Sequence, residues 1–379
     1  MTGAPELDAL RSRIDAVDRN IIALAAERLA LVRDVAEAKR AAGSPVFDRG
    51  RERAILERAA DHGTSAGVPP EVARRLIGAL IDASQQQQVA QLAHPTGAVS
   101  AEVPRRHLVV GGAGRMGQLL VRAFAALGHP VDVLEPEDPR PVAEVVRAAD
   151  VVILAVPMSR ATEVATTLGP LLRPDALLCD VNSLKAEVCE AMRRATEAEV
   201  LGLHPMFGPS VRTLRRQKVV VTPVRPGPLG DALQRDLGRL GLELVVSDAV
   251  THDRMMALVQ VLVHFHTLAM GEALRLTGVP IAESLRFTSP IYRLELSIVG
   301  RLFAQDPDLY AEIEMTNPFG QEVRAALREA IATFDRAIAS GDRAQFRQTF
   351  EDVAAYFGSF SSEAMRLSDQ IIEAFVAEP

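Results

Sequence analysis

This chain of 379 residues is poor in the residues that mark several classes of protein. It has no tryptophan and only 4% aromatic residues, which leaves little surface on which the bases of a nucleic acid could stack. Its two cysteines, Cys179 and Cys189, are too few for a disulfide framework or a cysteine metal site and favour a reducing cytoplasm. No apolar run reaches the length of a membrane span, and no secretory signal is evident. We therefore expect a cytoplasmic protein with no metal and no membrane partner.

Positive charge is also scarce. The formal net charge is −7, from 42 basic and 49 acidic residues. A nucleic-acid partner requires a basic surface, and we expect no such partner. Only three of the basic residues are lysines, Lys39, Lys185 and Lys218. A genome preference for arginine codons explains this scarcity, but the remaining lysines are candidate sites for a compact ammonium charge, which a planar guanidinium does not replace.

Residues 1–92 carry a helical pattern. We predict a helix from about Pro5 to Ala42, because apolar residues recur at spacings of three and four. These residues are Leu7, Leu10, Ile14, Val17, Ile21, Leu24, Leu31 and Val35. Such a helix spans roughly 57 Å, so its apolar seam needs other helices or a second subunit alongside. Two more helices, Arg49–Asp61 and Pro70–Leu92, are expected, with glycine-containing breaks between them, and residues 93–104 are predicted to be a linker.

Residues 105–249 alternate between short apolar runs and helical segments, which predicts a parallel, doubly wound sheet. The expected strands are Leu108–Gly112, Val131–Leu134, Val151–Val156, Ala176–Asp180, Val200–Leu203, Val219–Thr222 and Glu243–Val246. From 250 to 379 the pattern is helical, with breaks at Gly278-Val279-Pro280, Asp306-Pro307 and Asn317-Pro318. The expected order is thus an all-α domain, a Rossmann-type α/β domain and a second all-α domain.

A dinucleotide fingerprint, Gly112-Ala113-Gly114-Arg115-Met116-Gly117, follows the first predicted strand of the α/β domain. Gly112 permits a tight turn, Gly114 lets the backbone approach a pyrophosphate, and Gly117 allows close packing of the helix on the strand. Met116 lies within the same turn. Glu135 ends the next strand, where a carboxylate accepts the ribose hydroxyls and favours NAD over NADP. The alternative is a glycine-rich turn in a domain that binds no dinucleotide.

His204, in Leu203-His204-Pro205, ends another predicted strand, at the edge where open α/β sheets bind ligands. An exposed imidazole there can accept a hydroxyl proton as hydride leaves for nicotinamide. Ser183 could orient the histidine, and Lys185 could hold cofactor or substrate. The alternative is that His204 is only a turn residue before a proline.

In the last domain, Arg293 and Arg301 are eight residues apart and share one helix face, an arrangement that suits bidentate carboxylate binding. Ion pairs with Glu295 or Asp306 are the structural alternative. His264 lies in an apolar stretch, where a histidine is most often a core residue whose ring nitrogens are hydrogen-bonded.

In the first helix, Arg28 falls on the apolar seam, where an unpaired charge is costly. Arg11 lies 17 residues away, roughly 25 Å along the axis, so both reach one small ligand only if Arg11 comes from a partner subunit. The other candidates are Lys39, Asp48, Arg51, Glu52, Ser84 and Gln88. This basic set lacks a nucleophile–base pair. It therefore suits a site that binds a dianionic ligand in one conformation. A plain coiled-coil arm explains the heptads but leaves Arg28 unexplained.

Together these segments resemble the bacterial bifunctional chorismate mutase–prephenate dehydrogenases of tyrosine biosynthesis. The resemblance covers nearly the whole chain. Its most specific pieces are residues 110–117, residues 201–209 and residues 289–306. It implies a dimeric mutase domain with interlocked helices, then an NAD-binding domain and a helical dimerisation and substrate domain.

The resemblance also implies roles for the candidate residues. Arg11 of the partner subunit, Arg28 and Arg51 would hold the carboxylates of chorismate. Lys39 and Gln88 would hydrogen-bond its ether oxygen, Glu52 with Asp48 would meet the ring hydroxyl, and Ser84 would complete the pocket. In prephenate oxidation, His204 would accept the hydroxyl proton, helped by Ser183 and Lys185. Arg301 would bind a carboxylate, and His264 and Arg293 match positions of the substrate and tyrosine pocket.

The partners that the resemblance implies are chorismate, prephenate, a second copy of the chain and tyrosine as a feedback inhibitor. Three alternatives stay open from the residues alone. The helical arm could only dimerise or regulate, the substrate could be arogenate, or the protein could sense NAD without catalysis.

Overall fold

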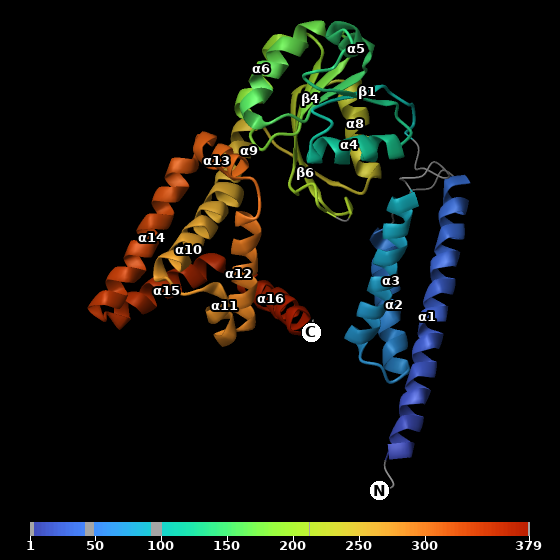
Figure 1. Ribbon diagram of the computed structural model, residues 1–379, viewed down its shortest axis with the longest axis vertical. Helices are drawn as coiled ribbons and strands as arrows, with labels where there is room; N and C mark the ends of the chain where they lie inside the picture. The colour runs from blue at the N-terminus through green and yellow to red at the C-terminus, as the bar shows by residue number, and fades with distance from the viewer. Residues whose placement is uncertain (1–3, 42–48, 92–100, 212, 378–379) are drawn as a thin grey trace. The chain divides into compact units, whose positions relative to one another are not determined.

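The computed structural model describes residues 4–41, 49–91, 101–211 and 213–377 (Figure 1). The chain divides into two compact units. The first contains the N-terminal helices and the sheet, and the second consists of Pro157–Glu163, Asn182–Ala191 and Ser247–Pro379. Two short segments that emerge from the sheet therefore belong to the helical C-terminal unit.

The first three helices are α1 (Ala4–Ala41), α2 (Arg49–Ser65) and α3 (Pro70–Gln91). Helix α2 passes through Gly63, so the predicted end at Asp61 was wrong. A Cβ at Gly63 would lie 2.6 Å from the Cβ of Ala73, so glycine allows α2 and α3 to approach closely there and does not break the helix. The apolar seam of α1 is exposed in the single chain, with Ile14 59% and Leu24 65% exposed.

The sheet has seven strands in the order β2-β1-β3-β4-β5-β6-β7. The strands are β1 (His107–Val110), β2 (Val131–Leu134), β3 (Val151–Leu154), β4 (Leu177–Asp180), β5 (Glu199–Pro205), β6 (Lys218–Arg225) and β7 (Glu243–Val246). Neighbouring strands are parallel except β5 and β6, which pair antiparallel. The predicted parallel arrangement was therefore wrong at this one pair. The reason is that no crossover helix separates them, and a parallel return needs one.

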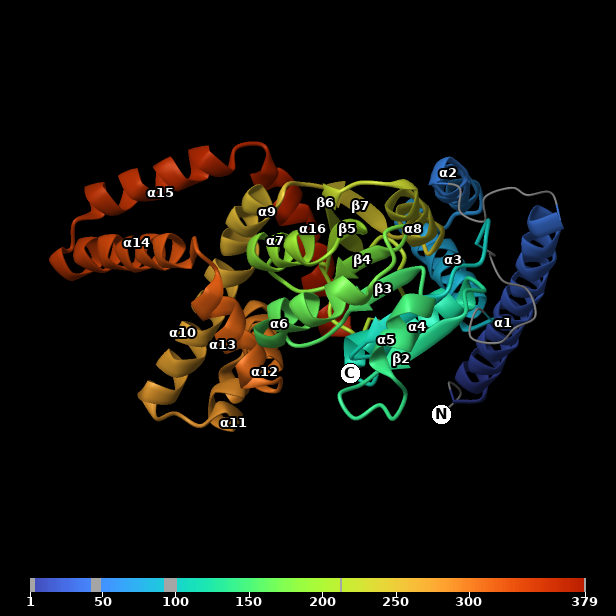
Figure 2. The ribbon, with the colours of Figure 1, turned by 90° about the horizontal axis from the view of Figure 1, so that it is seen from above.

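Helices cover both faces of the sheet, as a doubly wound fold requires. They are α4 (Arg115–Ala126), α5 (Val142–Ala148), α6 (Met158–Leu168), the short 3-10 turn η1 (Gly169–Leu171), α7 (Ala186–Ala195) and α8 (Pro228–Arg239). Figure 2 shows α4 and α8 on one side of the sheet. There Phe124 and Leu237 join a buried cluster with alternate strand residues such as Ile153 and Cys179. Cys179 is fully buried within β4, which lies inside the predicted strand Ala176–Asp180.

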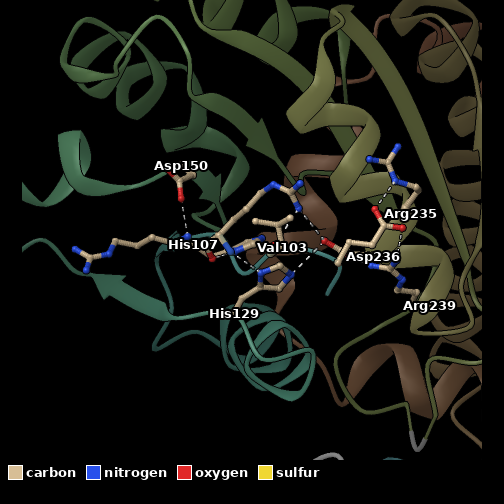
Figure 3. A network of polar contacts seen from close by, with 10 residues as sticks. Val103, His107, His129, Asp150, Arg235, Asp236 and Arg239 are labelled. Atoms are coloured by element: carbon tan, nitrogen blue, oxygen red, sulfur yellow. Dashed lines mark hydrogen bonds and ion pairs between the residues drawn. The ribbon is translucent and has the colours of Figure 1, made fainter. Parts of the chain in front are cut away.

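A buried polar network holds the amino end of β1 (Figure 3). The backbone N–H of Arg105 donates to Nδ1 of His129 at 3.1 Å, and Nε2 of His129 lies 3.1 Å from the carboxylate of Asp236 on α8. Arg239 donates to the other oxygen of Asp236 at 2.9 Å. His107 lies beside them, stacked on Phe124 with ring centroids 4.6 Å apart. The segment that enters the sheet is thereby fastened to α8 and to the turn before β2.

The C-terminal unit is helical. Its elements are α9 (Ala249–Met256), a π-helical turn η2 (Ala257–Leu262), α10 (Val263–Thr277), α11 (Ile281–Ser284), a 3-10 turn η3 (Leu285–Phe287), α12 (Pro290–Phe303), α13 (Pro307–Thr316), α14 (Gly320–Ser340), α15 (Arg343–Phe357) and α16 (Phe360–Ala377). The predicted breaks are confirmed: Gly278, with φ 74°, follows the last residue of α10 as its C-cap, and Asp306 caps α13.

The continuous stretch Ala249–Thr277 of the C-terminal unit is long and apolar enough to span a membrane by length and composition alone. Only 17% of its most apolar window is buried within the chain. The prediction that no apolar run reaches the length of a membrane span was therefore wrong for this stretch. An apolar helix surface of this kind is equally what packing against another protein chain requires, so the stretch by itself is weak evidence for a membrane.

Candidate active sites

The glycines of the fingerprint form a cradle at the carboxyl end of β1. A Cβ at Gly117 would lie 2.3 Å from the carbonyl oxygen of Gly111, so only glycine lets α4 start this close to the strand. The tight turn is at Gly111, whose φ is +80° and where a Cβ would lie 2.7 Å from the carbonyl oxygen of Ala155. The prediction that Gly112 supplies the tight turn was therefore wrong by one residue. Gly112 is needed for space, because its Cβ would lie 2.7 Å from Val133.

Glu135 lies beside this cradle. One of its carboxylate oxygens accepts the backbone N–H of Ala113 at 2.7 Å, which places the acid against the fingerprint turn. Arg140 lies in the same loop and donates to Asp132 and Asp138. Hydrogen bonds from the side chain and from the backbone N–H of Arg140, together with its charge, lower the pKa of Asp138 to about 2. An arginine held by two carboxylates is poorly placed to receive a 2′-phosphate, so the cradle and its acid fit NAD.

His204 lies within β5 and is 3% exposed. The expectation of an exposed imidazole was wrong, because β5 continues to Pro205 and pairs with β6 on its far side, which buries His204 opposite Val220. Its position at the carboxyl edge is as predicted: β4 ends at Asp180, which pairs with Gly202, two residues before His204. The histidine is thus a buried group at the ligand-binding edge of the sheet.

Ser183 and Lys185 lie in the loop between β4 and α7, in a segment that belongs to the C-terminal unit. Lys185 is fully buried. The loop is held by Asp253 on α9, which accepts the backbone N–H groups of Lys185 at 2.8 Å and of Ala186 at 2.9 Å. Sequence analysis missed Asp253. Its neighbours Thr251, His252 and Arg254 are also polar, so no local pattern singles it out. The predicted hydrogen bond from Ser183 to His204 stays a prediction.

A second cluster of polar side chains in the C-terminal unit consists of His264, Tyr310, Glu314 and Arg324. The ring of His264 lies edge-on to Tyr310, with centroids 5.0 Å apart, and its Nδ1 lies 3.9 Å from the carboxylate of Glu314. Burial lowers the pKa of His264. Burial also raises the pKa of Glu314 to about 7, although Arg324 opposes this shift from 3.8 Å. Sequence analysis singled out His264 alone, because Tyr310, Glu314 and Arg324 show no pattern of their own.

The two arginines of α12 are exposed at one helix face, as predicted. The charge of Arg301 acts on Tyr310, whose pKa is nevertheless raised by burial. His264 contacts Tyr310, and Arg301 lies close enough for its charge to act on the same ring. The ion pair of Arg301 with Asp306, considered as the structural alternative, is not among the interactions of the described residues. Arg293 lies eight residues earlier on the same helix.

In the N-terminal helices, Arg28 and Ser84 come together across 56 residues. The guanidinium of Arg28 donates to Oγ of Ser84 at 3.4 Å. Ser84 is 6% exposed, and its hydroxyl donates to the carbonyl of Leu80 at 2.6 Å, which leaves its lone pairs for acceptance. The structure thus joins two of the predicted mutase residues. Arg11 is exposed and lies 3.4 Å from Asp8.

The remaining mutase candidates are less fully described. Arg51 is exposed on α2. Asp48 lies outside the described residues, as do the side chains of Lys39, Glu52 and Gln88. Their assignments stay predictions.

Comparison with known proteins agrees with this division of the chain. The family model described as chorismate mutase type II matches residues 10–89. The model of the prephenate dehydrogenase nucleotide-binding domain matches residues 133–228, and that of its dimerization domain matches residues 248–352.

Similar proteins span the same length. A T-protein of Haemophilus influenzae is 33% identical over 97% of this chain and 96% of its own. A T-protein of Enterobacter agglomerans is 35% identical over 93% of each chain. The structure of a prephenate dehydrogenase from A. aeolicus with hydroxyphenyl propionate and NAD+ covers 68% of this chain and 98% of its own, at a TM-score of 0.55 and 17% identity. That likeness shows the shared fold.

Proposed function

The chain belongs to the T-protein family of bifunctional chorismate mutase–prephenate dehydrogenases, and we propose which of its residues carry each of the two reactions. The chain rearranges chorismate to prephenate and then oxidises prephenate with NAD in tyrosine synthesis. The proposal depends on two features found in the same chain. The helical domain pairs Arg28 with Ser84, and the α/β domain holds the glycine cradle with Glu135 beside it.

For the mutase reaction, we propose a pocket built from both subunits. The rearrangement is pericyclic, so the enzyme needs to hold the dianion in its reactive shape and stabilise the charge that develops on the breaking ether bond. Arg28, supported by Ser84, and Arg51 bind the carboxylates, together with Arg11 of the partner subunit. Lys39 and Gln88 hydrogen-bond the ether oxygen. Glu52, with Asp48, meets the ring hydroxyl.

For the dehydrogenase reaction, we propose His204 as the group that accepts the proton of the prephenate hydroxyl. NAD, when bound, would accept the hydride from the carbon that bears this hydroxyl. Its pyrophosphate would lie against Gly112, Gly114 and Gly117 at the start of α4, where backbone N–H groups favour an anion. Loss of CO2 follows because it makes the ring aromatic. A buried His204 suits this role, since exclusion of water strengthens its interaction with the hydroxyl.

Substrate is held in this proposal by residues of the C-terminal unit. Arg301 binds a carboxylate of prephenate, and Lys185 and Ser183 assist at the reacting ring. His264 and Arg293 contribute to the pocket that holds the substrate side chain and tyrosine. We propose that tyrosine inhibits the enzyme here, because it presents the same ring and carboxylate as the product of the reaction.

We further propose a cytoplasmic homodimer with contacts in both helical parts. The apolar seam of α1 is exposed in one chain, and Arg11 requires a partner. The C-terminal unit also exposes large apolar side chains, among them Phe287 at 83% and Phe350 at 62%. Exposed apolar surface of this extent is typical of an interface between subunits.

A coupled assay tests the function as a whole. Purified protein given chorismate and NAD should produce NADH and 4-hydroxyphenylpyruvate. Arg28→Ala should remove mutase activity and spare oxidation of supplied prephenate. His204→Asn should spare mutase activity and lower the rate of prephenate oxidation at least about a hundredfold, as for loss of a general base. A His204→Asn enzyme with a normal rate would overturn the assignment. Faster turnover of arogenate than of prephenate would instead assign arogenate as the substrate of the dehydrogenase.

A further inference from the structure

Asp253 is a buried carboxylate that the proposed reaction does not use. It lies on α9 and is 1% exposed. One oxygen accepts the backbone N–H of Lys185 at 2.8 Å and the other accepts that of Ala186 at 2.9 Å, across 68 and 67 residues. These N–H groups lie at the first turn of α7, where a helix leaves its donors without intrahelical acceptors. Asp253 therefore caps α7 from a distant part of the chain.

Asp253 is itself held on two sides. Nδ1 of the neighbouring His252 lies 2.7 Å from the carboxylate oxygen that faces Lys185. The side-chain amide of Asn317, between α13 and α14, donates to the carbonyl oxygen of Asp253 at 2.9 Å. Both the backbone and the side chain of Asp253 are thus fixed. Hydrogen bonds to an ionised carboxylate are shorter and stronger than neutral ones, and a negative charge suits the amino end of a helix.

The segment that Asp253 holds is the loop from which Ser183 and Lys185 extend. Residues 181–185 form neither strand nor helix between β4 and α7. A loop without regular hydrogen bonding moves more readily than the elements it joins. The two bonds from Asp253 fix the main chain at Lys185 and Ala186, so they fix the direction in which the nearby side chains leave it.

We propose that Asp253 is a positioning residue for prephenate oxidation, which sets the main chain from which Ser183 and Lys185 act. This inference rests on the proposed roles of these two residues. Asp253 does not touch substrate. A displacement of about 1 Å at a reacting group can lower a rate a hundredfold, so a loosened loop should slow the chemical step while leaving the cofactor cradle on β1 unchanged.

The chain offers a matched control for simple capping. The two oxygens of Glu199 accept the backbone N–H groups of Leu229 at 3.1 Å and Gly230 at 2.7 Å, in the first turn of α8. This is the same arrangement of a carboxylate and two successive donors, at a helix without an assigned catalytic residue. Glu199→Gln therefore reports what loss of a cap does by itself.

The experiment compares Asp253→Asn with Glu199→Gln in the full-length protein. An amide keeps the shape but turns a donor toward one of the two N–H groups. Asp253→Asn should lower kcat for prephenate oxidation about tenfold to a hundredfold, with KM for NAD and the mutase rate within about twofold of the wild type. Glu199→Gln should lower the melting temperature comparably and leave kcat within about twofold. A normal kcat in an Asp253→Asn protein that binds NAD overturns the proposal.

A double-mutant cycle with Lys185→Met decides whether Asp253 acts through the loop. If it does, Asp253→Asn should change kcat by less than about threefold in the Lys185→Met background, because coupled residues are not additive. Full additivity overturns the positioning role. If Lys185→Met alone leaves kcat unchanged, the proposed role of Lys185 fails instead.

Should Asp253→Asn fail to bind NAD, the same cycle is made with Asn317→Ala in place of Asp253→Asn. A smaller loss of kcat that is coupled to Lys185→Met is then expected, and an additive loss refutes the inference.

Discussion

Acid should destabilise the sheet unit through one buried histidine, His107. This side chain is 1% exposed. Its Nδ1 lies 3.0 Å from the carbonyl oxygen of Arg105, to which it donates, and its Nε2 is buried without a hydrogen-bond partner. A second proton would have to sit on Nε2, which has no hydrogen-bond acceptor among the described residues. Burial, and then the neighbouring His129, lower the pKa of His107 from 6.5 to about 4.

The size of the effect follows from this pKa. Between pH 6.5 and about 4 the unfolded chain binds a proton at His107 that the folded chain does not, so unfolding is favoured as the pH falls. The stabilisation is complete above pH 6.5, declines through this window by about 1.4 kcal/mol for each pH unit, and reaches a loss of about 3 kcal/mol at pH 4. Domains are commonly stable by about 5–15 kcal/mol, so the loss is substantial.

Comparison of wild type with His107→Leu tests this reasoning. Urea unfolding would be measured at pH 7.0, 5.5 and 4.5, with hydrogen exchange of peptides from residues 105–134 reporting the sheet unit. The variant loses the bond to Arg105 at every pH but should lack the decline, so the stability difference should shift toward the variant by about 2.4 kcal/mol between pH 7.0 and pH 4.5. His62→Leu, which replaces an exposed histidine on α2, is the control. Parallel pH dependence in wild type and His107→Leu would refute the argument.

Two further predictions concern the cofactor cradle. Glu135→Ser should raise KM for NAD about tenfold or more and narrow the preference for NAD over NADP, because a charged acceptor for the ribose is lost; steady-state kinetics with both cofactors measures this, and unchanged selectivity would exclude the role. Gly117→Ala should abolish NAD binding in calorimetry while leaving mutase activity intact, because its Cβ would lie 2.3 Å from the carbonyl oxygen of Gly111.

Much of the fold could be predicted because its signals are local. Strands β2 and β7 were predicted with their observed bounds, since short apolar runs between turns identify strands. The direction of β6 could not be predicted, because it depends on how the chain returns from β5 and not on the residues of β6. Gly63 was misjudged for the same reason: its use is contact with Ala73 on another helix.

Among the site residues, local motifs identified the glycine cradle but not the residues that hold other site residues in place. Arg28 could be singled out because a charge on an apolar seam conflicts with the pattern around it, and its contact with Ser84 followed only from the fold. Asp253 was missed because its two acceptor bonds reach across 68 and 67 residues. Residues that hold others in place have no spacing rule, since their partners are chosen by tertiary structure.

The polarity of β1 separates stability from cofactor binding. His107 begins this strand and Val110 ends it, so the buried histidine network and the cradle at Gly111 lie about 10 Å apart at opposite ends. Asp236 stabilises the amino end: although burial raises its pKa, the hydrogen bond and charge of His129, followed by those of Arg239, outweigh that effect and lower it. That contribution is lost only below about pH 4, beneath the window of His107. It follows that His107→Leu should alter acid stability at unchanged NAD affinity, and that Gly117→Ala should do the reverse.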